Sequence, residues 1–207
     1  IKIIIKDHMR VADFVIKFLE DKGIKNVFTV SGGGSIFLCD ALYKSKKLNY
    51  VSCHHEQAVS FATESYSRVK NKPGAAIITT GPGGTNCTTG VACCWIDSVP
   101  SIFISGQVYL NQTIKNTGLR QLGVQEFDIV SMVKTSTKYS VIIQTPESIK
   151  YHLEKAYYLS MEGRPGPVWV DIPANIQNAI INPKKLVGYK IKKKKLIHNQ
   201  INLKIKK

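Results

Sequence analysis

The sequence predicts one doubly wound α/β domain, in which a mainly parallel sheet carries helices on both faces. Short apolar segments alternate with longer helix-like segments over residues 1–183, and this alternation is typical of repeated βαβ units. The runs AAIITT and SIFIS contain no charged residue, as expected for strands that helices cover on both faces. The chain of 207 residues is long enough for one such domain with its own core.

The elements follow from the local pattern. Residues 11–22 place apolar side chains on one helical face, and Gly23 is a typical stop signal. The other helices are expected over residues 36–44, 56–69, 85–95, 125–133 and 146–161. The strands, which are short apolar runs between turn signals, are expected over residues 27–30, 50–53, 75–79, 101–105, 139–143 and 168–172. A long loop is expected from Gly106 to Gly123.

The composition excludes several classes of protein. With 43% hydrophobic and 21% charged residues, the chain reads as an ordinary globular domain. Because no window reaches 18 consecutive apolar residues, we expect no membrane-spanning helix and no membrane partner. The five cysteines are scattered and form no CxxC pair, which argues against a disulfide framework and against zinc. We therefore expect a cytoplasmic protein.

The net charge of +15 is unevenly distributed. Ten of the 29 Lys and Arg residues, and no acidic residue, lie in residues 184–207. We interpret this segment as a Lys-rich linker or truncated tail. A lysine run can bind nucleic acid nonspecifically, but no recognition motif accompanies it, so no specific nucleic-acid partner is expected.

Three loops are candidates for function, because ligands of open parallel sheets bind at the carboxyl ends of the strands. They cover residues 31–35, 53–57 and 79–86. Residues 79–86 contain the run GPGG, which allows close backbone approach to a ligand, yet it matches neither the Walker nor the GxGxxG motif. Glu56 opens a helix, where the helix dipole stabilises a carboxylate. Each observation also has a purely structural interpretation. Residues 79–86 could be a plain tight turn, and Glu56 could be an acidic residue that only stabilises the first turn of its helix.

Three stretches occur in a recognisable order: HHEQAVSFATESYSRVKNKPGAAIITTGPGGTN, SVPSIFISGQV and GRPGPVWVDIP. Together they resemble the N-terminal pyrimidine-binding domain of thiamine diphosphate enzymes. The nearest likeness is to the large subunit of acetolactate (acetohydroxyacid) synthase and its relatives. The resemblance extends from about Met9 to Gln177, and it makes residues 1–183 the pyrimidine-binding domain.

The resemblance implies two catalytic residues. Glu56 matches the glutamate that hydrogen-bonds N1′ of the cofactor's aminopyrimidine, where a shared proton favours the imino tautomer, whose N4′ can take the C2 proton. Gln125 matches a glutamine close to the substrate. The implied reaction joins 2-oxo acids such as pyruvate by decarboxylative carboligation, as in branched-chain amino acid biosynthesis.

The resemblance also implies cofactor contacts. The residues that would line the pyrimidine pocket are Gly81, Pro82, Gly83 and Asn86. Arg164 matches an arginine that holds FAD in the flavin-containing members. The GRPGPV turn also occurs in relatives without flavin, so the sequence leaves FAD open.

The sequence departs from the family in two places and lacks one part of it. Ser31-Gly32-Gly33-Gly34 stands where synthases usually have a proline–glycine pair, and GLRQLGVQE resembles acetolactate-synthase-like proteins of sugar and surface-polysaccharide pathways. The GDG…NN motif, through which the family's diphosphate domain holds Mg²⁺, does not occur. The resemblance therefore implies thiamine diphosphate, Mg²⁺ held by a missing domain, and a homodimer or homotetramer in the complete enzyme, with the isolated chain inactive.

Three alternatives stay open. The same scaffold could carry another thiamine diphosphate-dependent decarboxylase or lyase reaction. The chain could be a non-catalytic remnant that acts as an interaction domain. A dinucleotide-binding oxidoreductase is suggested by the fold alone, although the GxGxxG fingerprint is missing.

Overall fold

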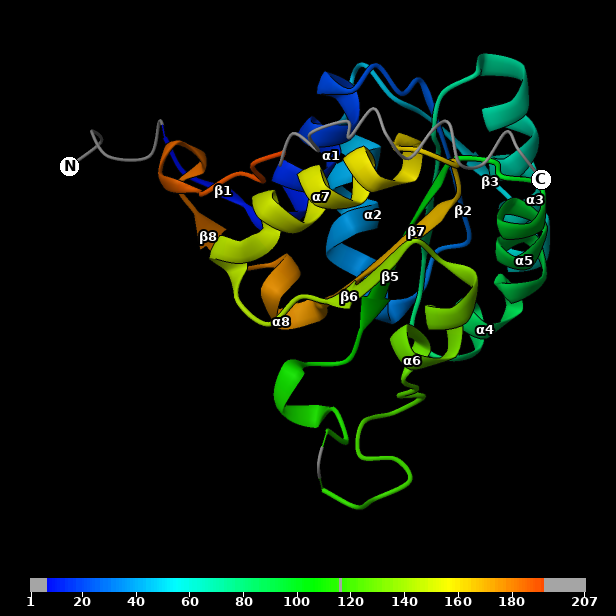
Figure 1. Cartoon of the computed structure of the whole chain (residues 1–207). Helices are drawn as coiled ribbons and strands as arrows, with labels where there is room; N and C mark the ends of the chain where they lie inside the picture. Colours follow the sequence, from blue (N-terminus) through cyan, green and yellow to red (C-terminus); the bar gives the residue numbers. More distant parts are fainter. Residues whose placement is uncertain (1–6, 116, 192–207) are drawn as a thin grey trace, which may run out of the picture.

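The computed structural model describes residues 7–115 and 117–191 and contains an open six-stranded sheet with helices on both faces (Figure 1). The order of the strands is β3-β2-β4-β5-β7-β6, and each neighbouring pair is parallel. The strands are β2 (Asn26–Thr29), β3 (Asn49–Ser52), β4 (Gly74–Ile78), β5 (Ser101–Gln107), β6 (Tyr139–Ile142) and β7 (Pro167–Pro173). The predicted fold class is thus confirmed.

The alternation of side chains along the strands divides the core into two layers. Ala75 and Ile77 of β4 belong to one apolar cluster, whereas Ala76 and Ile78 belong to the other. Successive side chains of a strand point to opposite faces, so a strand between two helical layers needs an uninterrupted apolar run. This requirement explains why β4, β5 and β7 are buried along their whole length.

The helices form one layer on each face of the sheet (Figure 1). One cluster includes residues of α1 (Val11–Asp21), α2 (Ile36–Lys44), α7 (Ile149–Met161) and α8 (Ala174–Gln177). The other includes residues of α3 (Glu56–Lys70), α5 (Thr88–Ile96) and α6 (Ile129–Val133). The short helix α4 (Pro82–Asn86) precedes α5, and 3₁₀ turns cover Gly33–Ser35, Leu110–Gln112, Lys134–Ser136, Pro146–Ser148 and Pro183–Lys185.

Three predicted helices differ from those observed, and the one expected over 146–161 begins as the 3₁₀ turn Pro146–Ser148 before it continues as α7. The helix expected over 85–95 begins earlier, because Pro82 occupies the first helical turn, where its fixed φ is favourable, and it is divided at Cys87 into α4 and α5. The helix expected over 125–133 begins only at Ile129. Gln125 has a φ of 58°, outside the helical region, and the side chain of Asp128 caps the helix by accepting from the Ser131 N–H.

Local pattern did not predict the second sheet. The strand β1 (Met9–Arg10) pairs antiparallel with β8 (Ile180–Ile181). Two residues are too few to show an alternation in the sequence. This pairing brings the first and last described strands of the domain together.

The first part of the predicted Lys-rich tail packs on the domain. Leu186 belongs to the apolar cluster under α1 and α7, and the backbone N–H of Tyr189 donates to Glu154 Oε2 at 2.7 Å. Residues 192–207, which hold most of the predicted tail, lie outside the described residues. The boundary at residue 183 stays a prediction.

The order of the strands locates the point where ligands are expected. The strand β2 has β3 on one side and β4 on the other. The order in which the chain adds strands to the sheet therefore reverses, and the switch point lies between β2 and β4. Such a switch point opens a crevice at the carboxyl ends of the strands. The loops that follow β2 and β4 therefore start side by side.

Candidate cofactor-binding site

The three loops singled out in the sequence meet at this switch point. The backbone N–H of Gly34, in the loop after β2, donates to Thr79 Oγ1 at 3.2 Å. The hydroxyl of Thr80 donates to the carbonyl of Gly106, at the end of β5. The loop after β3 joins them through Glu56, whose carboxylate accepts a hydrogen bond from Asn86. The structure thus brings the loops 31–35, 53–57 and 79–86 into one group.

Glu56 is the first residue of α3, and its side chain reaches the glycine loop. Its Oε2 accepts a hydrogen bond from Asn86 Nδ2 at 2.9 Å, and its backbone carbonyl accepts one from the Cys87 thiol at 3.1 Å. His55 caps the helix, because its Nδ1 accepts from the Gln57 N–H at 3.1 Å. Within the described residues, Glu56 Oε1 has no hydrogen-bond partner, and it is therefore available to a ligand.

The glycines of the loop allow two close approaches. Gly81 has a φ of 59°, and a Cβ at this position would lie 2.0 Å from the carbonyl oxygen of Gln125. A Cβ at Gly83 would lie 2.7 Å from Thr79 Cγ2 and 3.4 Å from Glu56 Oε1. Any side chain at Gly81 would displace the Gln125 segment. One at Gly83 would fill the space under the Glu56 carboxylate.

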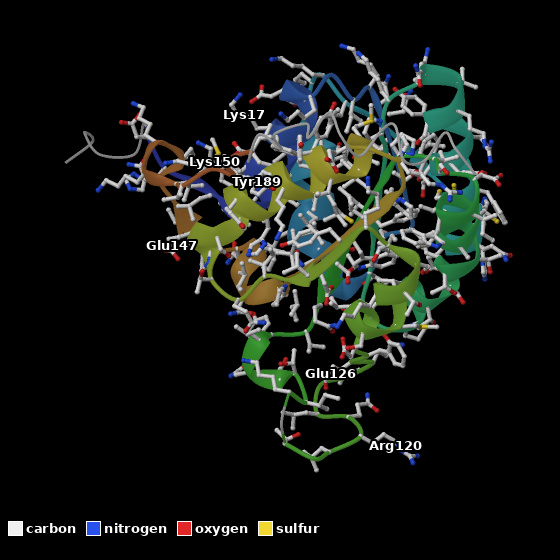
Figure 2. All side chains as sticks on the ribbon, in the orientation of Figure 1. Lys17, Arg120, Glu126, Glu147, Lys150 and Tyr189 are labelled. Atoms are coloured by element: carbon white, nitrogen blue, oxygen red, sulfur yellow. The ribbon has the colours of Figure 1, made fainter. Side chains whose placement is uncertain are left out.

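Gln125 lies in a turn of the segment between β5 and α6. Its backbone contacts Gly81, and its side chain is exposed. The neighbouring Glu126 holds the long loop together, because its two carboxylate oxygens accept from the backbone N–H groups of Ile114 and Leu122. Figure 2 shows Glu126 at the base of this loop and Arg120 at its tip, away from the sheet.

Arg164 lies apart from these residues. It precedes β7, at the amino edge of the sheet, whereas Glu56 and the glycine loop lie at the carboxyl edge. Its Nε donates to Ser98 Oγ at 2.6 Å, and its Nη2 donates to the carbonyl of Ile96 at 3.0 Å. In this position, the guanidinium caps the carboxyl end of α5.

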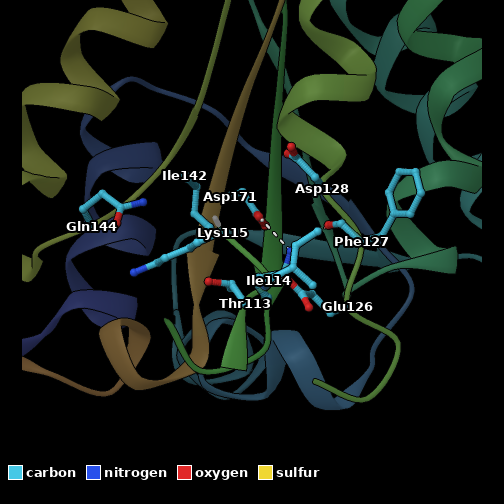
Figure 3. Close-up of a pocket in the computed structure, with 10 residues that line it drawn as sticks. Thr113, Ile114, Lys115, Glu126, Phe127, Asp128, Ile142, Gln144 and Asp171 are labelled. Carbon is cyan, nitrogen blue, oxygen red and sulfur yellow. Dashed lines mark hydrogen bonds between the residues drawn. The ribbon is translucent and has the colours of Figure 1, made fainter. Parts of the chain in front are cut away.

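A buried acid that the sequence analysis missed lies near the site. Asp171 of β7 is 1% exposed. Burial raises the pKa of its carboxyl to about 7, and nearby Asp128 also raises it, while hydrogen bonds from Ser105 and Gln107 oppose the change. Asp171 borders a cavity of about 150 Å³, which Figure 3 shows. The available signal was a single acidic residue in the otherwise apolar run PVWVDIP.

The cysteines are all free thiols, as the sequence predicted. Burial raises the pKa of the Cys87 thiol, and it raises the pKa of Cys94 to about 12. Among residues 7–115 and 117–191, no three His, Cys, Asp or Glu side chains gather as a set of metal ligands. No helix in the same part of the chain has the length and apolar character needed to cross a membrane.

An open parallel sheet with a glycine loop and a carboxylate at its switch point defines an α/β ligand-binding domain, and comparison with known proteins specifies its family. The family model described as "Thiamine pyrophosphate enzyme, N-terminal TPP binding domain" matches residues 9–132, more than half of the chain. The chain belongs to this family. The expected family is thereby confirmed, while the roles of individual residues stay predictions.

Acetolactate synthases are among the similar proteins. The chain is 38% identical over 186 residues to "Acetolactate synthase, chloroplastic" of Arabidopsis thaliana, covering 86% of this chain and 26% of the relative. It is 36% identical over 167 residues to the acetolactate synthase large subunit of Haemophilus influenzae, and 35% identical over 167 residues to acetolactate synthase isozyme 3 large subunit of Escherichia coli. In both cases the match covers 81% of this chain and 28% of the relative. The chain spans about a quarter of the length of the curated relatives it matches.

Proposed function

We propose that this chain provides the aminopyrimidine half of a thiamine diphosphate site in an acetolactate-synthase-like enzyme. The enzyme would join 2-oxo acids such as pyruvate by decarboxylative carboligation. The observation that carries the proposal is the position of Glu56. Its carboxylate lies over a glycine loop, with one oxygen held by Asn86 and the other available.

The residues present fit a flat aromatic ligand that accepts a hydrogen bond from a carboxyl group. Gly83 leaves room beside Glu56 Oε1, and Asn86 fixes the orientation of the carboxylate through Oε2. Glu56 would hold a proton at Oε1 and share it with a ring nitrogen. When bound, thiamine diphosphate supplies the nucleophilic carbon and the electron sink for the reaction of a 2-oxo acid.

Gln125 is proposed to contact the substrate. Its backbone contacts Gly81, at the start of the glycine loop, and the residue is exposed. A fixed backbone keeps the side chain within reach of the glycine loop, while the exposed side chain itself is ordered only on binding. The roles of Gly81, Pro82 and Asn86 in lining the pyrimidine pocket belong to the same proposal.

The proposal also requires a partner surface. The loop between β5 and α6 carries exposed apolar side chains, among them Val124, which is 83% exposed, and Leu119, which is 52% exposed. This loop extends away from the body of the domain (Figure 1). Exposed apolar groups beside a half-open site favour coverage by another domain or by a second chain. We propose that the domain or second chain that covers this loop holds the diphosphate through Mg²⁺, in a homodimer or homotetramer.

FAD stays an open alternative. A flavin held by Arg164 would have to reach the amino edge of β7, where the guanidinium is bonded to Ser98 and to the Ile96 carbonyl. Thiamine diphosphate at Glu56 requires none of these contacts. The two cofactors can therefore be tested separately.

The deciding experiment measures the product formed from pyruvate by an assembled enzyme in which a diphosphate-binding domain completes this chain. We expect acetolactate, and we expect Glu56→Gln to lower its formation by at least about 100-fold, because an amide cannot hold and return a proton. Glu147→Gln, the same change at an exposed residue of the 3₁₀ turn before α7, is the matched control. Retention of more than a tenth of the rate by Glu56→Gln would overturn its role.

The products also separate the alternatives. Acetaldehyde in place of acetolactate would indicate a thiamine diphosphate-dependent decarboxylase on the same scaffold. No conversion of pyruvate or of other 2-oxo acids would favour a non-catalytic interaction domain. NAD binding in a direct titration would support the oxidoreductase alternative instead.

A further inference from the structure

A chain of hydrogen bonds crosses the centre of the sheet, where the proposed function uses none of its members. Trp169 Nε1 donates to Ser105 Oγ at 2.7 Å, and Ser105 Oγ donates to Asp171 Oδ1 at 2.6 Å. Gln107 Nε2 donates to Asp171 Oδ2 at 3.1 Å. Each of these four side chains is no more than 2% exposed. Buried polar groups are costly unless they are paired, and this set is paired throughout.

The chain of hydrogen bonds ends at the backbone of the Gln125 segment. Gln107 Nε2 donates a second hydrogen bond, at 3.0 Å, to the carbonyl of Phe127. The other end of the same amide is also fixed, because Gln107 Oε1 accepts from the Val108 N–H at 3.0 Å. The amide therefore has one orientation, in which its NH₂ group joins Asp171 to Phe127.

Residues on both sides of Phe127 press against the glycine loop. The carbonyl oxygen of Gln125 occupies the space where a Cβ at Gly81 would lie. A Cβ at Gly84 would lie 3.1 Å from Ile129 Cγ1. The Phe127 carbonyl also accepts from the Ile129 N–H at 2.9 Å, so its position fixes the start of α6.

We propose that Asp171 and Gln107 form a strut that positions residues 125–129 against the glycine loop 81–84. Asp171 accepts one hydrogen of the Gln107 amide and so directs the other toward Phe127. Both are positioning residues, because they act on the segment through its backbone. The inference goes beyond the proposed function and holds whichever reaction the site carries out, since every contact lies within this chain.

The cavity beside Asp171 contributes the other charged groups that face it. Lys115, Glu126 and Asp128 line this cavity, and Figure 3 shows them around Asp171. Glu126 is held by the N–H groups of Ile114 and Leu122, and Asp128 caps α6. These carboxylates therefore have partners of their own, while the Gln107 amide serves Asp171.

The test is amide hydrogen exchange of the full chain, read at the amides of Glu126 and Ile129. Gln107→Met keeps the approximate size of the side chain and removes both donors. We expect the protection of the Glu126 and Ile129 amides to fall by about 5-fold, the factor that corresponds to one ordinary hydrogen bond. Gln177→Met is the matched control, because Gln177 is also fully buried and donates to two carbonyls elsewhere, those of Gly34 and Ile172.

Unchanged protection in a folded Gln107→Met variant would overturn the proposal, as would an equal loss in Gln177→Met. If Gln107→Met fails to fold, Gln107→Asn decides. It keeps the amide on a side chain that is one methylene shorter, so its NH₂ group cannot join Asp171 to the Phe127 carbonyl, and we expect the same loss of protection. Protection in Gln107→Asn equal to that of the unchanged protein would overturn the strut.

Discussion

Replacing Asp171 with asparagine should stabilise the protein in neutral and alkaline solution. The carboxyl lies in the centre of the sheet, and burial is the largest cause of its raised pKa. Asparagine has nearly the same shape and carries no charge. Its Oδ1 can still accept from Gln107 Nε2, the hydrogen bond that Asp171 accepts at 3.1 Å. The substitution therefore removes the titration and preserves the contact with Gln107.

The size of the effect follows from the pKa. In the unfolded chain, the carboxyl ionises near pH 3.8, whereas in the folded protein it keeps its proton up to about pH 7. The unfolded state gains from ionisation first, so stability is greatest in acid and declines as the pH rises toward 7. At 1.36 kcal/mol per pH unit, the decline amounts to about 4 kcal/mol in total, of which about 3 kcal/mol falls between pH 5 and pH 8.

Urea unfolding at pH 5 and at pH 8 measures this difference. We expect the stability of Asp171→Asn relative to the unchanged protein to increase by about 3 kcal/mol between the two pH values. Asp21→Asn removes an exposed carboxylate from its surface pair with Lys17 and should shift stability by less than about 1 kcal/mol. A relative stability of Asp171→Asn that is constant with pH, or that decreases toward pH 8, would refute the reasoning.

Two further predictions concern the glycine loop and the thiols. Gly81→Ala should destabilise the domain by more than about 3 kcal/mol in urea unfolding, because its φ is positive and its Cβ would meet the Gln125 carbonyl. Gly118→Ala also has a positive φ but no atom within 4 Å, so it should cost only about 1 kcal/mol, and equal costs would contradict the contact. Cys87 and Cys94 should react with a thiol reagent far more slowly than the other three cysteines, because both are buried and the pKa of each thiol is raised. Mass spectrometry after timed alkylation would show this, and early labelling of either residue would contradict it.

Much of the candidate site was predictable because its parts follow strands of one parallel sheet. Glu56 follows β3 and the glycine loop follows β4, and both strands end at the same edge. A pattern read along the chain does not give the order of the strands. The contact between Glu56 and Asn86, which are 30 residues apart, depends on how the loops at that edge are packed.

The parts that could not be predicted depend on contacts between distant residues. The positive φ of Gln125 belongs to a non-glycine residue, for which the sequence gives no turn signal. The raised pKa of Asp171 comes first from burial of β7 between the two helical layers, with a smaller contribution from Asp128, 43 positions away along the chain. In each case, the local sequence supplies the group, and the packing of other elements determines its behaviour.

The two catalytic candidates are held by different kinds of contact. Glu56 is fixed locally, by the start of α3 and by Asn86, whereas the Gln125 segment is fixed from the centre of the sheet through Gln107. Asp171→Asn changes the charge at the centre and keeps an acceptor for Gln107, and Gln107→Met removes the donor and keeps the acid. The first should raise stability at pH 8 without loosening residues 125–129, and the second should loosen them at any pH. A gain in stability without loosening in Asp171→Asn, together with loosening in Gln107→Met, would separate the stability of the sheet from the positioning of the site. A general loss of packing would change both quantities in both variants.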